Sequence, residues 1–171
     1  ETEGAKAFRE AVCMKLKRDN GLDYDPSQII VTCGAKQAIS TALDVLLDAG
    51  QEVLIRSPYW VSYPDMVKLA RGVPVFIPTN EKNRYKITSS DLEKYTTSKT
   101  VALILNNPSN PTGVLYNKEE LLKISTWCKD KGVVVIADEV YERIVFSGRT
   151  FTSIASLSKD IYENTITING L

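Results

Sequence analysis

Short apolar runs alternate along the chain with longer segments of helical periodicity. Six of the runs have the length of strands and are rich in Val, Ile and Leu: residues 29–32, 53–55, 73–77, 101–105, 133–137 and 165–168. Their apolar residues are mostly consecutive rather than alternating with polar ones, which is typical of strands that are buried on both faces. The pattern therefore predicts six strands in a sheet that is covered on both sides.

The segments between these runs predict helices, and the clearest covers residues 118–131. Asn117 is placed to cap its N-terminus, Glu120 stands three residues later as in a capping box, and Gly132 supplies a left-handed stop. This helix has both of its ends marked in the sequence.

Two further helices are predicted nearer the N-terminus. One begins near Ala35 and ends before Gly50, and an amphipathic one covers residues 5–18 and stops at Asn20-Gly21. Strands that alternate with helices predict an α/β fold of three layers, in which a mostly parallel sheet has helices on both faces. In such a sheet the ligand site lies beyond the carboxyl ends of the strands.

The composition is that of an ordinary globular protein: 171 residues, 43% hydrophobic and 25% charged, with 21 basic and 21 acidic side chains. The balanced charge disfavours a nucleic acid or an anionic membrane as a partner, because both need a basic face. No apolar run is long enough to span a membrane. Cys13, Cys33 and Cys128 are widely spaced, which favours reduced thiols and a cytoplasmic location over a disulfide framework or a zinc site.

The sequence contains no histidine. This excludes from the chain a Ser-His-Asp triad, a Cys-His pair and an HExxH zinc site. Any catalysis within it is expected to use carboxylates, lysine, tyrosine or a bound cofactor, and no metal site is predicted.

Polar and aromatic residues follow the first two predicted strands. Gly34-Ala35-Lys36 opens a helix whose N-terminal amides are suited to bind a phosphate, although a plain strand-to-helix turn has the same pattern. Trp60 follows the next strand, and it is either a flat face for a cofactor ring or a core side chain.

The loop after residues 101–105 contains two Asn-Pro steps, Asn107-Pro108 and Asn110-Pro111. Each proline keeps the preceding asparagine out of the helical region, so the side-chain amides are held on a stiff turn, and either peptide bond is open to the cis form. A rigid loop that presents asparagine at the ligand edge is more than a connector needs. A surface turn remains the alternative.

Asp138-Glu139 follows five apolar residues, and a carboxylate at the end of a buried strand needs a cation or a donor. Two ligands fit: Mg²⁺ in a P-loop NTPase, or a protonated heterocyclic nitrogen. The sequence has neither the GxxxxGK[ST] motif of the NTPase nor the GxGxxG motif of dinucleotide sites. A helix N-cap role for Asp138 stays open as an alternative. Tyr141 reaches the same site if the chain turns helically here.

Together these segments resemble the class I/II aminotransferases, the fold-type I enzymes that use pyridoxal 5′-phosphate (PLP), and most of all the bacterial-type aspartate aminotransferases. The resemblance covers nearly the whole chain and rests on five motifs in family order: Gly34-Ala35-Lys36-Gln37-Ala38, Ser57-Pro58-Tyr59-Trp60-Val61-Ser62-Tyr63-Pro64, Asn107-Pro108-Ser109-Asn110-Pro111-Thr112-Gly113, Asp138-Glu139-Val140-Tyr141 and Thr167-Ile168-Asn169-Gly170-Leu171. It implies that residues 1–171 are an incomplete PLP-binding large domain, with the small domain and the C-terminal part outside this chain.

The resemblance also implies a role for each residue around the cofactor ring. Asp138 is expected to pair with the pyridinium nitrogen and keep it protonated, so that the ring withdraws electrons from the α-carbon of the substrate. Asn110 and Tyr141 are expected to hydrogen-bond the phenolic oxygen of the ring, and Trp60 to stack on the ring. Asp138 and Tyr141 are therefore the expected catalytic residues of this chain.

The turn formed by Gly34, Ala35 and Lys36 is expected, by the same resemblance, to bind the phosphate of the cofactor. The lysine that forms the Schiff base with PLP is expected just beyond Leu171, outside this chain. A Ser-Lys step ending at Lys159 looks like that of the family but precedes the last predicted strand, so Lys159 is expected at the surface.

The function implied by the resemblance is transfer of an amino group between an amino acid, with aspartate as the best candidate, and a 2-oxo acid. The resemblance further implies a homodimeric enzyme. Two alternatives stay open: another fold-type I enzyme such as a C-S lyase, and a catalytically inert fragment. The substrate is not readable from this chain, because most residues that recognise its carboxylates are expected elsewhere.

Overall fold

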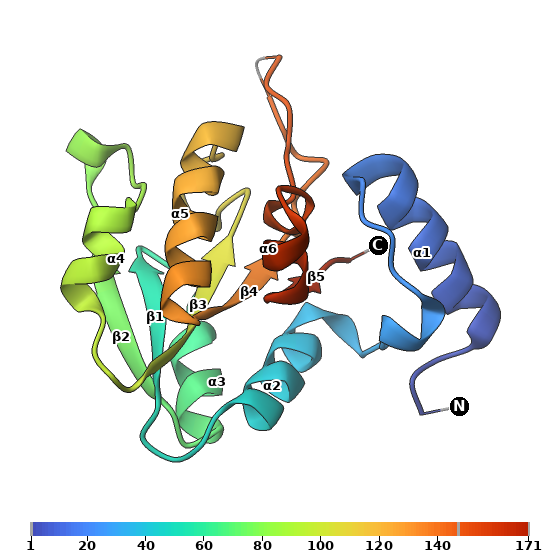
Figure 1. Cartoon of the computed structure of the whole chain (residues 1–171), viewed down its shortest axis with the longest axis horizontal. Helices are drawn as coiled ribbons and strands as arrows, with labels where there is room; N and C mark the ends of the chain where they lie inside the picture. The colour runs from blue at the N-terminus through green and yellow to red at the C-terminus, as the bar shows by residue number, and fades with distance from the viewer. Residues whose placement is uncertain (1, 147, 171) are drawn as a thin grey trace.

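Figure 1 shows the computed structural model of the chain, which describes residues 2–146 and 148–170. Five parallel strands form one sheet in the order β2-β1-β3-β4-β5. The strands are β1 (Glu52–Ser57), β2 (Val73–Pro78), β3 (Thr100–Asn106), β4 (Val134–Asp138) and β5 (Thr165–Ile168). The parallel α/β sheet predicted from the sequence is confirmed.

Helices cover both faces of the sheet. The α-helices are α1 (Lys6–Asn20), α2 (Gly34–Leu46), α3 (Tyr63–Leu69), α4 (Ser89–Tyr95), α5 (Lys118–Lys131) and α6 (Lys159–Glu163). Short 3₁₀ turns are η1 (Pro26–Gln28), η2 (Glu81–Asn83) and η3 (Ile154–Ser156). In Figure 1, α2 and α3 lie on one side of the sheet, α4, α5 and α6 lie on the other, and α1 lies beside the β5 end.

Successive residues of the strands pack into opposite layers. In β1, Val53 and Ile55 belong to the buried cluster that contains Leu43 of α2, whereas Leu54 belongs to the cluster that contains Leu121 of α5. Because both faces are covered, nearly every strand position needs an apolar side chain, and this accounts for the consecutive Val, Ile and Leu of the sequence.

One predicted strand, residues 29–32, is wrong. The segment lies outside the sheet, and Ile30 is 66% exposed. A backbone hydrogen bond from the Val31 amide to the Glu3 carbonyl oxygen (2.9 Å) links it to the N-terminal segment. Ile29 packs instead against the small cluster that attaches α1. An apolar run becomes a strand only where a neighbouring strand offers its backbone, and none of the described strands does so here.

Helix α5 begins and ends where the sequence predicts. The Asn117 side chain accepts a hydrogen bond from the Glu120 amide, and the Glu120 side chain accepts one from the Asn117 amide, both at 2.8 Å. Gly132 ends the helix with a φ of 66°. The sequence predicts helices in the segments that contain α3, α4 and α6 but not their bounds, and these helices have only 7, 7 and 5 residues. Such lengths are too short for a 3.6-residue period to stand out.

Gly132 is expected to stabilise the protein through its backbone conformation alone. Beyond its chain neighbours, no heavy atom lies within 4 Å of the position that a Cβ would take. Gly132→Ala should therefore lower the free energy of unfolding by about 1 kcal/mol, and Gly132→Asn by less, because asparagine tolerates the left-handed region. Urea unfolding followed by far-UV circular dichroism measures both. Equal losses for the two variants would contradict this explanation.

Candidate functional site

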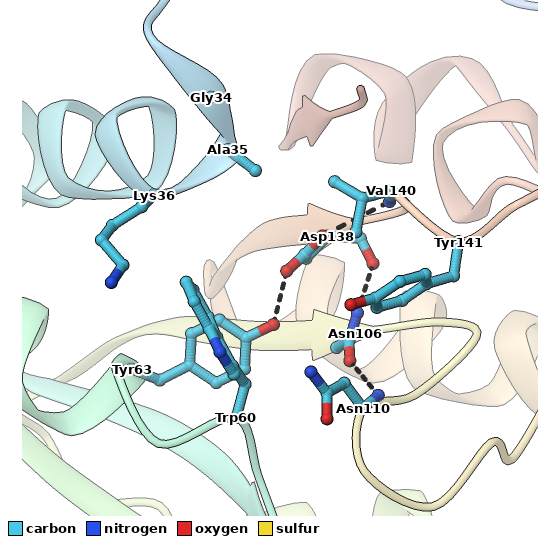
Figure 2. Close-up of a pocket in the computed structure, with 10 residues that line it drawn as sticks. All are labelled: Gly34, Ala35, Lys36, Trp60, Tyr63, Asn106, Asn110, Asp138, Val140 and Tyr141. Atoms are coloured by element: carbon cyan, nitrogen blue, oxygen red, sulfur yellow. Dashed lines mark hydrogen bonds between the residues drawn. The ribbon is translucent and has the colours of Figure 1, made fainter. Parts of the chain in front are cut away.

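A cavity of about 300 Å³ opens at the carboxyl ends of the strands (Figure 2). Its lining consists of Gly34, Ala35, Lys36, Trp60, Tyr63, Asn106, Asn110, Asp138, Val140 and Tyr141. All seven site residues predicted from the sequence are among these ten. They come from loops and strand ends that are far apart in the chain, and the parallel sheet brings these segments to one edge.

The carboxylate of Asp138 lies at the centre of the site. Asp138 is the last residue of β4, stands opposite Asn106 of β3 and is 4% exposed. The Tyr63 hydroxyl donates a hydrogen bond of 2.5 Å to Oδ2, and the Val140 amide makes a longer contact of 3.4 Å with Oδ1. Burial raises the pKa of Asp138 above the ordinary aspartate value, and the Tyr63 hydroxyl opposes this rise. Residues 140–143 form a turn rather than a helix, so the alternative of a helix N-cap is wrong.

Tyr63 is a site residue that sequence reasoning missed. It is the first residue of α3, is 2% exposed, and meets the Trp60 ring edge-on, with ring centroids 5.4 Å apart. Burial and the neighbouring Asp138 carboxylate raise the pKa of Tyr63 far above that of a free tyrosine. Its hydroxyl therefore stays protonated and remains a donor. Its place three residues after Trp60 was visible in the sequence, but its partner 75 residues away was not.

Asn106 is a second missed residue, and it fixes the asparagine-proline loop to the sheet. Its side-chain amide donates to the Asp138 carbonyl oxygen at 3.0 Å, and its Oδ1 accepts from the Asn110 amide at 2.5 Å. Both Asn-Pro peptide bonds of the loop are cis. In Figure 2 the Asn110 side chain is directed into the cavity.

The N-terminus of α2 forms the opposite wall. Gly34 begins this 13-residue helix with a φ of 81°. Among the described residues, no acceptor contacts the amides of Ala35 and Lys36, so both remain available to an anion. The Lys36 ammonium lies 5.1 Å from the centroid of the Trp60 ring.

Tyr141 completes the cavity from the turn that follows β4. Its ring extends toward Asn106, and its hydroxyl lies between Asp138 and Asn110 in Figure 2. The turn is closed by a hydrogen bond from the Glu142 amide to the Glu139 carbonyl oxygen (3.0 Å) and places Tyr141 at the cavity without forming a helix. The donor groups of Asn110 and Tyr141 thus face one side of the cavity, and the Asp138 carboxylate faces another.

Glu139 points away from the cavity and is 1% exposed. Its Oε1 accepts from the Ile154 amide at 3.2 Å, while no described residue hydrogen-bonds Oε2. Its own amide donates to the Ile168 carbonyl oxygen at 2.9 Å, which ties the end of β4 to β5. Burial raises the pKa of Glu139 to about 8.

The remaining candidates lie outside the site. Lys159, at the start of α6, has a side chain that is 86% exposed, as expected for a surface residue. Within residues 2–146 and 148–170, no cluster of His, Cys, Asp and Glu is suited to hold a metal ion, and no helix is long and apolar enough to cross a membrane. The three cysteines, Cys13, Cys33 and Cys128, are free thiols.

The family model and the sequence relatives that match this chain belong to the same family. The family model of aminotransferase class I and II matches residues 1–171. Aspartate aminotransferases from Geobacillus stearothermophilus and Bacillus subtilis are 47% and 44% identical over 168 residues, which are 98% of this chain and 43% of each enzyme. This chain therefore spans less than half the length of these relatives.

Solved structures agree with the sequence relatives. An aromatic aminotransferase from Pyrococcus horikoshii matches with a TM-score of 0.95 and 41% identity over 99% of this chain and 45% of that one. The aspartate aminotransferase from Rhizobium meliloti matches with a TM-score of 0.96 and 35% identity over 99% of this chain and 42% of that one.

The buried carboxyl of Glu139 should make stability depend on pH. Its folded pKa of about 8 lies above the ordinary value of 4.5, so the folded state binds more protons between these values, and the free energy of unfolding falls as the pH rises through this window. Glu139→Gln removes the charge and keeps an acceptor for Ile154. The variant should therefore exceed the wild type by roughly 2–4 kcal/mol at pH 8 and by little at pH 4.5.

Urea unfolding at a series of pH values measures this difference. Glu163→Gln, on the exposed face of α6, is the matched control and should shift stability by the same small amount at every pH. A Glu139→Gln difference that is also independent of pH would refute the shifted pKa.

Proposed function

Because this chain belongs to the class I and II aminotransferases, we propose that the protein carrying it transfers an amino group between an amino acid and a 2-oxo acid, with PLP in the cavity of Figure 2. Enzymes of this family use PLP. The observation that carries the proposal is the Asp138 carboxylate, which is buried and faces a cavity that also contains a flat aromatic wall and a free helix N-terminus.

The residues of the cavity fit PLP group by group. Among the described residues no cation pairs with Asp138, so its carboxylate is available to a protonated ring nitrogen. Such a nitrogen would offset the burial that now raises the pKa of Asp138. Trp60 offers its ring face, and the amides of Ala35 and Lys36 suit a phosphate dianion. The volume is at the lower end of the range for small-molecule sites.

Bound PLP would supply the electron sink that stabilises negative charge at the α-carbon of the substrate. The part of Asp138 is to hold the proton on the ring nitrogen, because a carboxylate at that atom favours the charged ring. Tyr63 fixes the orientation of the carboxylate through its hydrogen bond to Oδ2. Asn110 and Tyr141 are suited to donate to the phenolic oxygen on the other side of the ring.

Aspartate is the proposed amino donor, supported by the relatives from Geobacillus and Bacillus that carry this name. A homodimeric enzyme in the cytoplasm completes the proposal. Family resemblance supports the dimer, and the free thiols Cys13, Cys33 and Cys128 accord with a reducing compartment.

Two substitutions separate the electronic role of Asp138 from the stacking role of Trp60. Asp138→Asn should lower kcat by on the order of 100-fold, because the proton on the ring nitrogen acts in the transition state. Trp60→Phe keeps an aromatic face and should change kcat by less than about tenfold. Steady-state kinetics of the protein carrying this chain measures both, with the exposed Asp160→Asn on α6 as the matched control. A wild-type kcat for Asp138→Asn would eliminate the role proposed for Asp138.

The nucleotide alternative gives an opposite binding result. A phosphate monoester needs only amides and a few donors, whereas a nucleoside triphosphate needs a Gly-rich loop and Mg²⁺. Calorimetry should therefore show saturable PLP binding in the presence of a chelator and no binding of Mg-ATP. Saturable Mg-ATP binding that Asp138→Asn abolishes, without PLP binding, would overturn the proposed function.

A further inference from the structure

Arg56 is a charged residue inside a strand that is otherwise apolar. It is the last but one residue of β1, which lies between β2 and β3 in the sheet, and it is 5% exposed. Since side chains alternate along a strand, Arg56 shares the face of Leu54, which α5 covers. Burial of a guanidinium at such a place lowers the stability of the fold unless hydrogen bonds replace those that the group makes with water.

The compensation comes from two loops and from no carboxylate. One guanidinium nitrogen donates to the Tyr85 carbonyl oxygen at 2.9 Å, and the other makes a short hydrogen bond to the Ser109 hydroxyl. None of the ion pairs formed by the described residues includes Arg56. Burial lowers the pKa of Arg56, but a guanidinium remains charged in proteins. Its planar fork therefore joins the loop after β2 to the loop after β3.

Ser109 is the residue before Asn110, so its position helps to set where Asn110 points, together with the Asn106 side chain that accepts from the Asn110 amide. The Ser109 hydroxyl also accepts from Thr112 at 3.0 Å, its amide donates to the Val114 carbonyl oxygen at 3.0 Å, and its carbonyl oxygen accepts from the Gly113 amide at 2.7 Å. The loop thus folds around Ser109, and Arg56 is its attachment to the sheet on the side away from the cavity.

We propose that Arg56 is a positioning residue, which holds residues 107–113 through Ser109 and thereby keeps the Asn110 side chain directed into the cavity. The effect on the cofactor rests on the proposed function, whereas the hold on the loop does not. Arg56 does not line the cavity and forms its hydrogen bonds with Tyr85 and Ser109 outside the lining, although its charge acts on Tyr63. The influence of its hydrogen bond to Ser109 on a ligand therefore passes through Asn110.

The first measurement is amide hydrogen exchange of the cofactor-free protein. Arg56→Met keeps the apolar stem and removes both hydrogen bonds, and Ser109→Ala removes the hydroxyl that accepts from Arg56 and from Thr112. Both should accelerate exchange of the Ser109-to-Gly113 loop about tenfold relative to wild type, while α5 exchanges as before. Arg18→Met, which removes an exposed arginine of α1, is the matched control. Wild-type exchange of the loop in a folded Ser109→Ala variant would overturn the proposal, even if Arg56→Met does not fold.

The second measurement is a double-mutant cycle on PLP affinity in the protein carrying this chain. Arg56→Met and Asn110→Ala should each weaken PLP binding about tenfold, and the double variant should be weaker than either by much less than a further tenfold, because Arg56 acts through Asn110. Fully additive losses would overturn the proposal. Failure of the wild type to bind PLP would refute the proposed function. The hydrogen-exchange rates of the loop would still test whether Arg56 holds that loop in place.

Discussion

A carboxylate at the end of a strand that is covered on both faces is the constraint on which this site depends. Asp138 is 4% exposed, and a charge at that depth is tolerated only where donors or a cation meet it. Tyr63 provides one donor at 2.5 Å and has to stay protonated to do so. Tyr63 begins α3 three residues after Trp60, so the aromatic wall and the hydrogen bond to Asp138 come from a single turn of chain.

Two buried residues of opposite charge, Asp138 and Arg56, contribute to the site in different ways. Asp138 ends β4 and faces the cavity, whereas Arg56 lies near the end of β1 and faces the loops outside it, with β3 between them in the sheet. The acidic charge is left for a ligand, because only neutral donors of the protein reach it. The guanidinium of Arg56 instead donates to Tyr85 and Ser109. In the proposed function Asp138 recognises the ring nitrogen of the cofactor, and Arg56 holds the loop that presents Asn110.

Local signals were sufficient for most of the fold. The runs that form β1 to β5 and the capped ends of α5 carry their information within a few residues, so the sequence predicts them well. Residues 29–32 have the same apolar character as a strand, but they form none, because strand pairing depends on a neighbouring strand that the local pattern does not describe. Helices were predicted between the strands, but the bounds of α3, α4 and α6 were not, because these helices are shorter than two turns.

In the site, too, local sequence signals predict some of the residues and not others. Asp138 follows a predicted strand directly, Trp60 and Asn110 lie in the loops after two others, and the rule for parallel sheets was enough to bring them to one edge. Tyr63 and Arg56 have roles that depend on partners 75 and 53 residues away, and no spacing in the sequence reveals such contacts. Long-range hydrogen bonds to buried charges are thus the part of this site that required three-dimensional structure.

Pairing of Asp138 with a protonated ring nitrogen is tested most directly by comparing PLP with an analogue in which carbon replaces that nitrogen. A hydrogen bond between charged groups contributes on the order of 10- to 100-fold in affinity. The wild-type protein should therefore bind PLP at least about tenfold more tightly than the analogue, and Asp138→Asn should reduce this difference severalfold. Equal dissociation constants for the two ligands in the wild type would contradict the account.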